Sequence, residues 1–286
     1  MAANDGYHGA RRRDGSARGS VETAAPARKS ARVSDTGKID LLAKLRTLTA
    51  ARVGLGRCGN AMPTAPLLEF QAAHARARHA VHDALDSERL SVQLFDLAPI
   101  AVASRVQNRR EFLQRPDLAR KLHAADAARL PKGPFDIVFV LADGLSASAL
   151  NSHAAPVLRQ ALAGLADWRV APPVIACQAR VALGDEIAAC MGAAAVAVLI
   201  GERPGLAAAD SLGIYVTWHP QAGTIDSERN CISNIHGRGL SHTEAAGRLV
   251  WLLENARAKG YTGVALKDEY RAPISIGEAA PGQGEQ

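Results

Sequence analysis

Four short apolar runs in the second half of the chain carry its clearest structural signal. They span residues 137–141, 170–176, 193–200 and 212–218, and none of them alternates regularly with polar residues. Strands that are apolar throughout belong to sheets covered on both faces, which are typically parallel. Stretches with apolar residues at helical spacing separate several of these runs. This alternation predicts an α/β domain over residues 131–272, with a Rossmann-like, doubly wound sheet.

The preceding stretch, residues 39–130, has a different pattern. Leucines recur at helical spacing from Leu41 to Leu48, a second helical pattern follows Pro66, and a third covers residues 117–129. No segment of this stretch has the pattern of a long buried strand. We therefore predict a small helical N-terminal domain ahead of the α/β domain.

Both ends of the chain lack hydrophobic periodicity. Residues 1–38 are rich in Ala, Arg, Ser and Gly, and residues 273–286 are rich in Gly and Glu, so both are predicted to be flexible tails. The net charge is +6, but residues 1–39 alone carry eight Lys and Arg against four acids. Most of the basicity therefore belongs to the tail. This distribution favours a solvated tail over an adaptor that binds nucleic acid.

Cysteine usage and hydropathy restrict the setting of the protein. The four cysteines have neither CxxC nor metal-finger spacing, and no apolar stretch approaches the roughly 18 residues of a membrane helix. The first residues lack the apolar run of a signal peptide. These features predict a reduced, cytoplasmic protein with neither a membrane partner nor a metal site of its own.

Polar, glycine-containing loops follow the apolar runs. They comprise residues 143–146, residues 201–205, and residues 229–237 beyond His219. Because ligands of open α/β sheets bind outside the carboxyl ends of the strands, these loops indicate a ligand platform on one rim. The alternative is that Asp143 and Ser146 only form a turn and cap a helix. The pattern alone leaves both interpretations open.

Two short motifs are misleading at first sight. Residues 54–59 match GxGxxG, but a helical pattern precedes them and two prolines follow, where the dinucleotide fingerprint needs a strand and then a helix. This disfavours a stand-alone nucleotide-binding oxidoreductase, the alternative function for such a sheet. Residues 234–239 come within one residue of DxHxxG, in which a carboxylate orients a cobalt-binding histidine. Asn234 cannot supply that charge, so we expect His236 to form hydrogen bonds within its loop.

Two longer segments resemble a known family. Gly201-Glu202-Arg203-Pro204-Gly205-Leu206 and Cys231-Ile232-Ser233-Asn234-Ile235-His236 resemble the small (light) subunit of ethanolamine ammonia-lyase. Residues 51–53, 115–118 and 143–146 support the resemblance, which covers about residues 40–270. Residues 1–38 match no motif of the family.

The resemblance implies a role in an adenosylcobalamin-dependent lyase, which converts ethanolamine to acetaldehyde and ammonia by a radical rearrangement. The implied partner is the large subunit, a TIM barrel that holds the substrate and most of the catalytic groups. The implied assembly is a dodecamer of six large and six small subunits, in the cytoplasm or within a bacterial microcompartment. The small subunit of the family covers part of the cobalamin at the subunit interface. It supplies neither a catalytic residue nor a direct cobalt ligand.

The family's cofactor contacts carry over to Val181, Glu202 and Cys231. Val181 suits the apolar corrin, Glu202 can accept hydrogen bonds from amide or ribose donors, and Cys231 contributes shape without a reactive thiol. An alternative role for Glu202 is a salt bridge with Arg203 or with the large subunit. The secondary candidates on the same rim are Asp143, Ser146 and Asn234.

Overall fold

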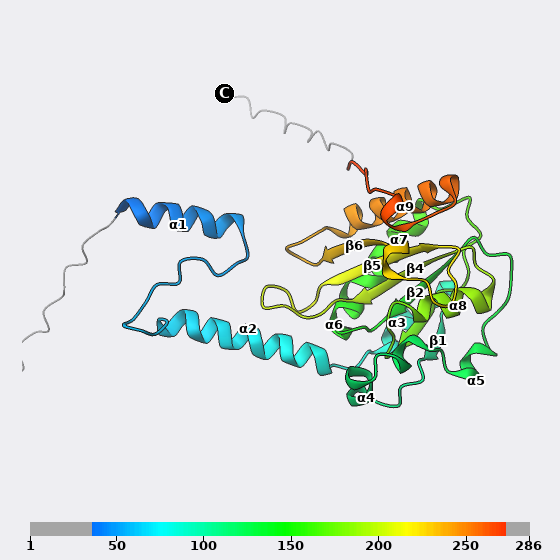
Figure 1. The fold of residues 1–286 in the computed structure, drawn as a ribbon, viewed down its shortest axis with the longest axis horizontal. Coiled ribbons are helices and arrows are strands. Elements are labelled where there is room, and N and C mark those ends of the chain that lie inside the picture. Colours follow the sequence, from blue (N-terminus) through cyan, green and yellow to red (C-terminus); the bar gives the residue numbers. More distant parts are fainter. Residues whose placement is uncertain (1–35, 273–286) are drawn as a thin grey trace, which may run out of the picture. The chain divides into compact units, whose positions relative to one another are not determined.

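The computed structural model describes residues 36–272, with side chains from Leu41 onward, and is drawn in Figure 1. The chain divides into two compact units, with the boundary between Thr49 and Ala50. In the first unit the described part is a single helix, α1 (Thr36–Leu48). The predicted tails lie outside the described residues, apart from the first residues of α1.

The second unit contains six strands and eight α-helices within the described residues. The strands are β1 (Ile100–Ala103), β2 (Ile137–Ala142), β3 (Val174–Cys177), β4 (Ala195–Gly201), β5 (Leu212–Trp218) and β6 (Asn230–Ile235). The helices are α2 (Thr64–His82), α3 (Ser87–Gln93), α4 (Arg109–Gln114), α5 (Ala124–Ala127), α6 (Ala147–Ala149), α7 (Ala155–Ala163), α8 (Leu183–Met191) and α9 (His242–Lys259). A π-helical segment, Leu150–Ala154, joins α6 to α7.

Local sequence signals account for the ends of several elements. The Ser241 hydroxyl accepts a hydrogen bond from the Glu244 N–H (3.2 Å) at the start of α9, and Gly260 ends that helix with φ of +80°. The strand predicted over 170–176 is confined to β3, because Pro172 and Pro173 have no N–H to donate to a ladder. The helix predicted over 117–129 is broken into a short 3₁₀ turn and α5.

The strands form one sheet in the order β1-β3-β2-β4-β5-β6. The first four strands of that order are parallel, whereas β5 is antiparallel to β4 and β6 is antiparallel to β5. The predicted α/β class is confirmed. The sheet is mixed, however, although continuous apolar runs are typical of parallel sheets.

Two strands lie where the sequence pattern indicates none. β1 falls within the stretch predicted to be helical, so that prediction is wrong for residues 100–103. Its four residues are too few to give a periodicity signal of their own. β6 falls within a stretch interpreted as a loop, and its burial alternates irregularly because it is an edge strand with one exposed face.

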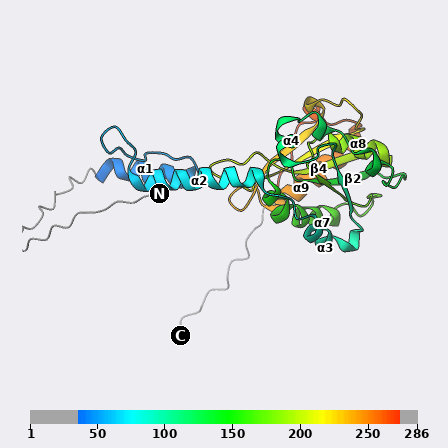
Figure 2. The ribbon, with the colours of Figure 1, turned by 90° about the horizontal axis from the view of Figure 1, so that it is seen from below.

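The sheet separates two apolar cores. On one face, Phe139, Leu199 and Ile214 pack in a core with residues of α3, α7 and α9. On the other face, Val140 and Val198 pack in a core with residues of α8. Figure 2 shows the sheet between α8 and α4 on one side and α3, α7 and α9 on the other.

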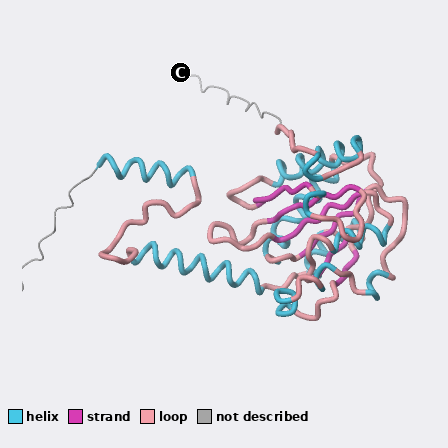
Figure 3. Tube along the Cα trace, in the orientation of Figure 1, coloured by secondary structure: helices cyan, strands magenta, loops and turns pink. Residues whose placement is uncertain are grey.

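The α8 face of the sheet is only partly covered. The alternation of side chains places Tyr215 of β5 and Cys231 of β6 on this face, where the register pairs them with each other. Tyr215 is half-buried and Cys231 is exposed. The loops after β4 and β6 project from the same end of the sheet (Figure 3). An open patch of sheet therefore lies beside the rim that was predicted to bind a ligand.

Two glycines allow the carboxyl ends of β2 and β4 to meet. Gly144 has φ of +53°, and a Cβ added there would lie 2.3 Å from the Gly201 oxygen. A Cβ added at Gly201 would lie 2.0 Å from the Ser146 oxygen. The Leu145 N–H donates to the Gly201 oxygen (2.9 Å), which ties the two loops together. Any side chain at Gly201 would separate them.

We predict that Gly201→Ala lowers the free energy of unfolding by about 1–3 kcal/mol, because backbone must move to accept the methyl group. Gly237→Ala is the matched control, since nothing lies within 4 Å of a Cβ added there. Denaturant unfolding of both variants and the parent measures the difference. Equal unfolding midpoints for the two variants would contradict the close approach.

Candidate functional site

A β-bulge shapes the open patch. Ile214 pairs with Ile232 and Leu212 pairs with Ile235, so two residues of β6, Ser233 and Asn234, stand opposite the single Gly213 of β5. Asn234 takes a left-handed conformation with φ of +66°. Bulges of this kind occur often beside active sites, where they redirect backbone groups. Here the bulge turns the Asn234 N–H toward the end of β4.

Glu202 lies across this bulge. Its carboxylate accepts hydrogen bonds from the Ser211 hydroxyl and from the Asn234 N–H (3.3 Å). A Cβ at Gly213 would come within 2.9 Å of the Glu202 Oε1, so the missing side chain there gives the carboxylate its place. Within residues 41–272 the Glu202 carboxylate forms no ion pair, which excludes the salt bridge with Arg203. Its remaining acceptor capacity faces the patch.

Tyr215 and Cys231 form the floor of the patch. Burial, together with the neighbouring Cys231 and Glu202, raises the pKa of Tyr215 to about 12. Neighbouring protein atoms also desolvate the Cys231 thiol, although the residue as a whole is exposed. This desolvation raises the pKa of Cys231, as does the Glu202 carboxylate, while the Tyr215 hydroxyl opposes the rise. Both groups therefore stay protonated near neutral pH, and Cys231 is not a nucleophile there.

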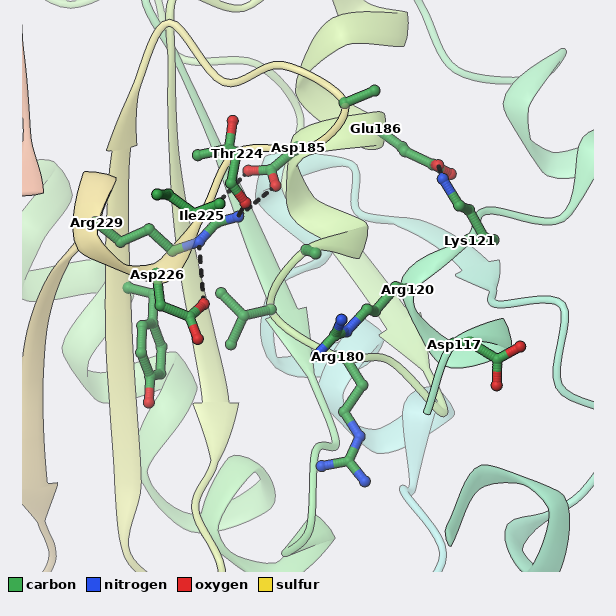
Figure 4. A pocket seen from close by; sticks show the side chains of 15 residues that line it. Asp117, Arg120, Lys121, Arg180, Asp185, Glu186, Thr224, Ile225, Asp226 and Arg229 are labelled. Carbon is green, nitrogen blue, oxygen red and sulfur yellow. Dashed lines mark hydrogen bonds and ion pairs between the residues drawn. The ribbon is translucent and has the colours of Figure 1, made fainter. Parts of the chain in front are cut away.

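Val181 borders the patch on the other side. It belongs to the loop after β3 and, together with Tyr215, lines a cleft of about 680 Å³ between α8 and the loop of residues 219–229. Figure 4 shows this cleft, with Arg120 and Arg180 on one wall and the contacts of Arg229 on the other. Val181, Glu202 and Cys231 thus come from three segments, and each lies near Tyr215: Val181 lines the same cleft, Cys231 pairs with Tyr215 across the strands, and the Glu202 charge acts on it.

A buried ion pair fixes the wall formed by residues 219–229. The Arg229 guanidinium donates to both Asp185 carboxylate oxygens (2.7 and 2.6 Å), and the two side chains are 1% and 2% exposed. It also donates to the Thr217 hydroxyl (2.8 Å) and the Thr224 carbonyl (2.9 Å). This network joins α8, β5 and the loop, so the cleft has a rigid wall.

Two of the secondary candidates, Asp143 and Ser146, have side chains that point into the protein. The Asp143 carboxylate is buried and accepts hydrogen bonds from the Ala179 N–H (3.0 Å) and from Arg109 (3.3 Å). Burial raises its pKa, and these two donors oppose the rise. The Ser146 hydroxyl is also buried; it caps α6 by accepting from the Ala149 N–H (3.3 Å) and donates to the Ala209 carbonyl (2.8 Å). Both side chains shape the rim from behind.

The side chains of Asn234 and His236 form a hydrogen bond with each other. The two groups are 2.8 Å apart, between His236 Nε2 and Asn234 Oδ1, and the Arg238 N–H donates to His236 Nδ1 (3.3 Å). Because Nδ1 accepts, Nε2 carries the proton and donates to Asn234. The expected hydrogen bonding of His236 within its loop is confirmed. Residues 54–59, by contrast, lie in a turn before α2 with no strand leading into it, so the dinucleotide fingerprint is absent there.

Several residues of this surface have no signal in the sequence. Tyr215 is one of seven residues of an apolar strand, and only the antiparallel register shows that it faces the patch. Asp185 and Arg229 are 44 positions apart, and neither belongs to a motif. Arg180 stands directly before Val181, and that neighbourhood is the one signal that could have indicated it.

The fold and the patch define a class of protein, an α/β protein with a mixed six-stranded sheet and an open, partly polar patch on one face. Within that class, the chain belongs to the ethanolamine ammonia-lyase light-chain family, whose profile matches residues 39–267. No group of three or more His, Cys, Asp or Glu side chains within residues 41–272 is placed to hold a metal ion. No helix between residues 36 and 272 has the length and apolar character needed to cross a membrane.

Individual relatives agree with the family profile. The ethanolamine ammonia-lyase small subunit of Rhodococcus erythropolis is 49% identical over 246 residues, covering 84% of this chain and 95% of the relative. That of Bradyrhizobium diazoefficiens is 50% identical over 247 residues, covering 83% and 95%. That of Xanthomonas campestris pv. campestris is 46% identical over 256 residues, covering 85% and 94%. The described fold therefore falls almost entirely within the region shared with these proteins.

We predict that Cys231 reacts slowly with iodoacetamide at pH 7.5, because its raised pKa leaves little thiolate. The rate should rise steeply as the pH is increased above the ordinary thiol range. Mass spectrometry of alkylated peptides measures the rate, with the exposed Cys58 as the internal reference. Alkylation of Cys231 as fast as that of Cys58 at pH 7.5 would show that the thiol is not held in its protonated form.

Proposed function

We propose that this chain is the small subunit of an adenosylcobalamin-dependent ethanolamine ammonia-lyase and that it covers part of the cofactor at the interface with the large subunit. Family membership supports the activity. The observation that carries the site is the open sheet patch around Tyr215, which Val181, Glu202 and Cys231 surround. The small-subunit name of the relatives supports the partner.

The chemistry of the patch fits a corrinoid. A corrin is a broad apolar ring with amide groups around its rim, so it needs a flat surface with polar groups at the edge. β5 and β6 supply the flat surface, and Gly213, which has no side chain, leaves room for Glu202 beside it. The Tyr215 hydroxyl and the Glu202 carboxylate supply polar groups suited to amides.

Each predicted contact then has a physical role. Val181 packs against the apolar part of the corrin, and Glu202 accepts hydrogen bonds from amide or ribose donors through the oxygen capacity that Ser211 and Asn234 leave open. Cys231 fills space beside Tyr215 with a neutral thiol. Covering the cofactor in this way excludes water from the reaction. Asp143 and Ser146 act from behind the rim by holding its loops.

The bound adenosylcobalamin supplies the radical chemistry by which ethanolamine rearranges to acetaldehyde and ammonia. In this proposal the large subunit, a TIM barrel, holds the substrate, and six large and six small subunits form the active assembly. The complex works in the cytoplasm or in a bacterial microcompartment. This chain contributes no group that touches the reacting atoms.

Co-expression with a large subunit of the same family tests the proposal. We expect a stable complex that binds cobalamin, keeps the corrinoid absorption spectrum through gel filtration, and releases acetaldehyde from ethanolamine. Native mass spectrometry of the complex gives the stoichiometry. A chain that remains monomeric and colourless beside such a partner would rule the proposal out.

We predict that Glu202→Ala weakens cobalamin binding to the reconstituted complex about tenfold, because a charge-assisted hydrogen bond is lost. Glu202→Gln should show a smaller loss, since the amide keeps one acceptor. Glu88→Gln is the matched control, because Glu88 is exposed on α3, on the opposite face of the sheet. Absorbance titration measures the affinities, and circular dichroism checks the fold. Unchanged affinity for the alanine variant would remove Glu202 from the site.

A further inference from the structure

Three arginines gather where the rim meets the cleft. Arg120 and Arg180 line the cleft together with Val181, and Arg203 follows Glu202 directly in the chain. They are close enough for their charges to interact: burial lowers the pKa of Arg180, the positive charges of Arg109, Arg120 and Arg203 lower it further, and the Asp143 carboxylate opposes this shift. We call Arg120, Arg180 and Arg203 the arginine cluster.

The carboxylates of the surroundings do not neutralise this cluster. Asp143 is committed to Arg109, and the four carboxylates of the cleft are also committed. Asp117 pairs with Arg115, Glu186 with Lys121, and both Asp185 and Asp226 with Arg229. Within residues 41–272 no carboxylate forms an ion pair with Arg120, Arg180 or Arg203. The three guanidinium charges therefore have no ion-pair partner within these residues, and the Asp143 carboxylate, which is paired with Arg109, acts on Arg180 only at longer range.

Arg180 is held ready for an anion. Its guanidinium carbon lies 4.5 Å from the centroid of the Phe112 ring. The guanidinium carbon of Arg109 lies at the same distance, 4.5 Å, from that centroid. This stacking fixes the plane of the guanidinium and lowers the entropy lost on binding. The Arg180 Nε is buried and has no hydrogen-bond partner in the described residues. A buried, unpaired donor of this kind is costly unless a ligand accepts from it.

From these charges we infer that the arginine cluster binds the phosphodiester of the cobalamin nucleotide loop, an inference that rests on the proposed function. The peripheral groups of the corrin are neutral amides, and the phosphodiester is the one anion that hangs from the ring. Arg180 and Arg203 stand next in the chain to Val181 and Glu202, two of the proposed corrin contacts. Arginine's planar donors match phosphate oxygens in geometry as well as charge.

Two corrinoids that differ by one phosphate group provide the test. Cobinamide ends at the aminopropanol arm and lacks the phosphate, ribose and base, whereas cobinamide phosphate carries one phosphate on the same arm. Titration of the large–small complex with each probe gives two affinities, and their ratio is the preference for phosphate. We expect the parent complex to prefer cobinamide phosphate by about tenfold or more. Added KCl should reduce the preference, because salt screens the charges.

Arg180→Gln and Arg120→Gln should reduce this preference several-fold while leaving cobinamide affinity unchanged. Arg180→Lys, which keeps the charge, should retain more of the preference than Arg180→Gln. Arg169→Gln is the matched control, because Arg169 pairs with Asp136 at the opposite end of the strands and should leave the ratio unchanged. Gel filtration and circular dichroism establish that each variant still folds and assembles.

The outcomes separate this inference from the proposed function. A parent complex that binds neither probe nor cobalamin itself would overturn the proposed function. Equal affinity of the parent complex for the two probes would overturn the phosphate site and leave the cobalamin proposal intact. Loss of subunit association in the glutamine variants, with the phosphate preference unchanged in the complex that remains, would assign the cluster to an acidic segment of the large subunit. That result would also overturn the inference.

Discussion

The handedness of strand crossovers determines where this protein leaves its sheet open. A connection between parallel strands is right-handed, so the helix of a crossover lies on a face set by the direction in which the chain moves. β3 lies on one side of β2 and β4 on the other, so α7 and α8 fall on opposite faces. After β4 the chain continues through antiparallel neighbours with no α-helix between them, and α9 then returns to the α7 face. The α8 face of β5 and β6 therefore receives no α-helix from such a crossover, and the open patch lies there.

Electrostatics keeps this open surface in one shape. The Asp185–Arg229 pair is fully enclosed, and removing one partner of such a pair typically costs about 3–5 kcal/mol, because the other charge stays buried. The pair holds residues 219–229 against Thr217, to which Arg229 donates a hydrogen bond. Tyr215 stays at the edge of the cleft. At the carboxyl end of β2, the ion pair between Asp143 and Arg109 holds the neighbouring loops in a similar way. The charges that hold the walls are therefore used up within the protein, whereas those of the arginine cluster are left for a ligand.

The sequence pattern predicts the elements whose burial is uniform. β2 and β4 are apolar and buried along their whole length, and the caps of α9 are visible in Ser241 and Gly260. β1 and β6 escape prediction, since one is too short and the other is exposed on one face. Asn234 and Glu202 were identified by resemblance, but their hydrogen bond across Gly213 depends on a bulge. No periodicity reveals an extra residue in a strand, and long-range pairs such as Asp185 with Arg229 depend on the finished topology.

The strand order also has a kinetic consequence. β5 joins its neighbours through connections of about ten residues, whereas β1 pairs with a strand roughly seventy residues further along the chain. Closing a short loop costs less conformational entropy than closing a long one, and local contacts speed folding. The edge that carries the platform is therefore the edge whose pairing closes most cheaply. The β1 edge forms only after the long crossover, so the hairpins of β4, β5 and β6 belong to the part of the sheet favoured to form first.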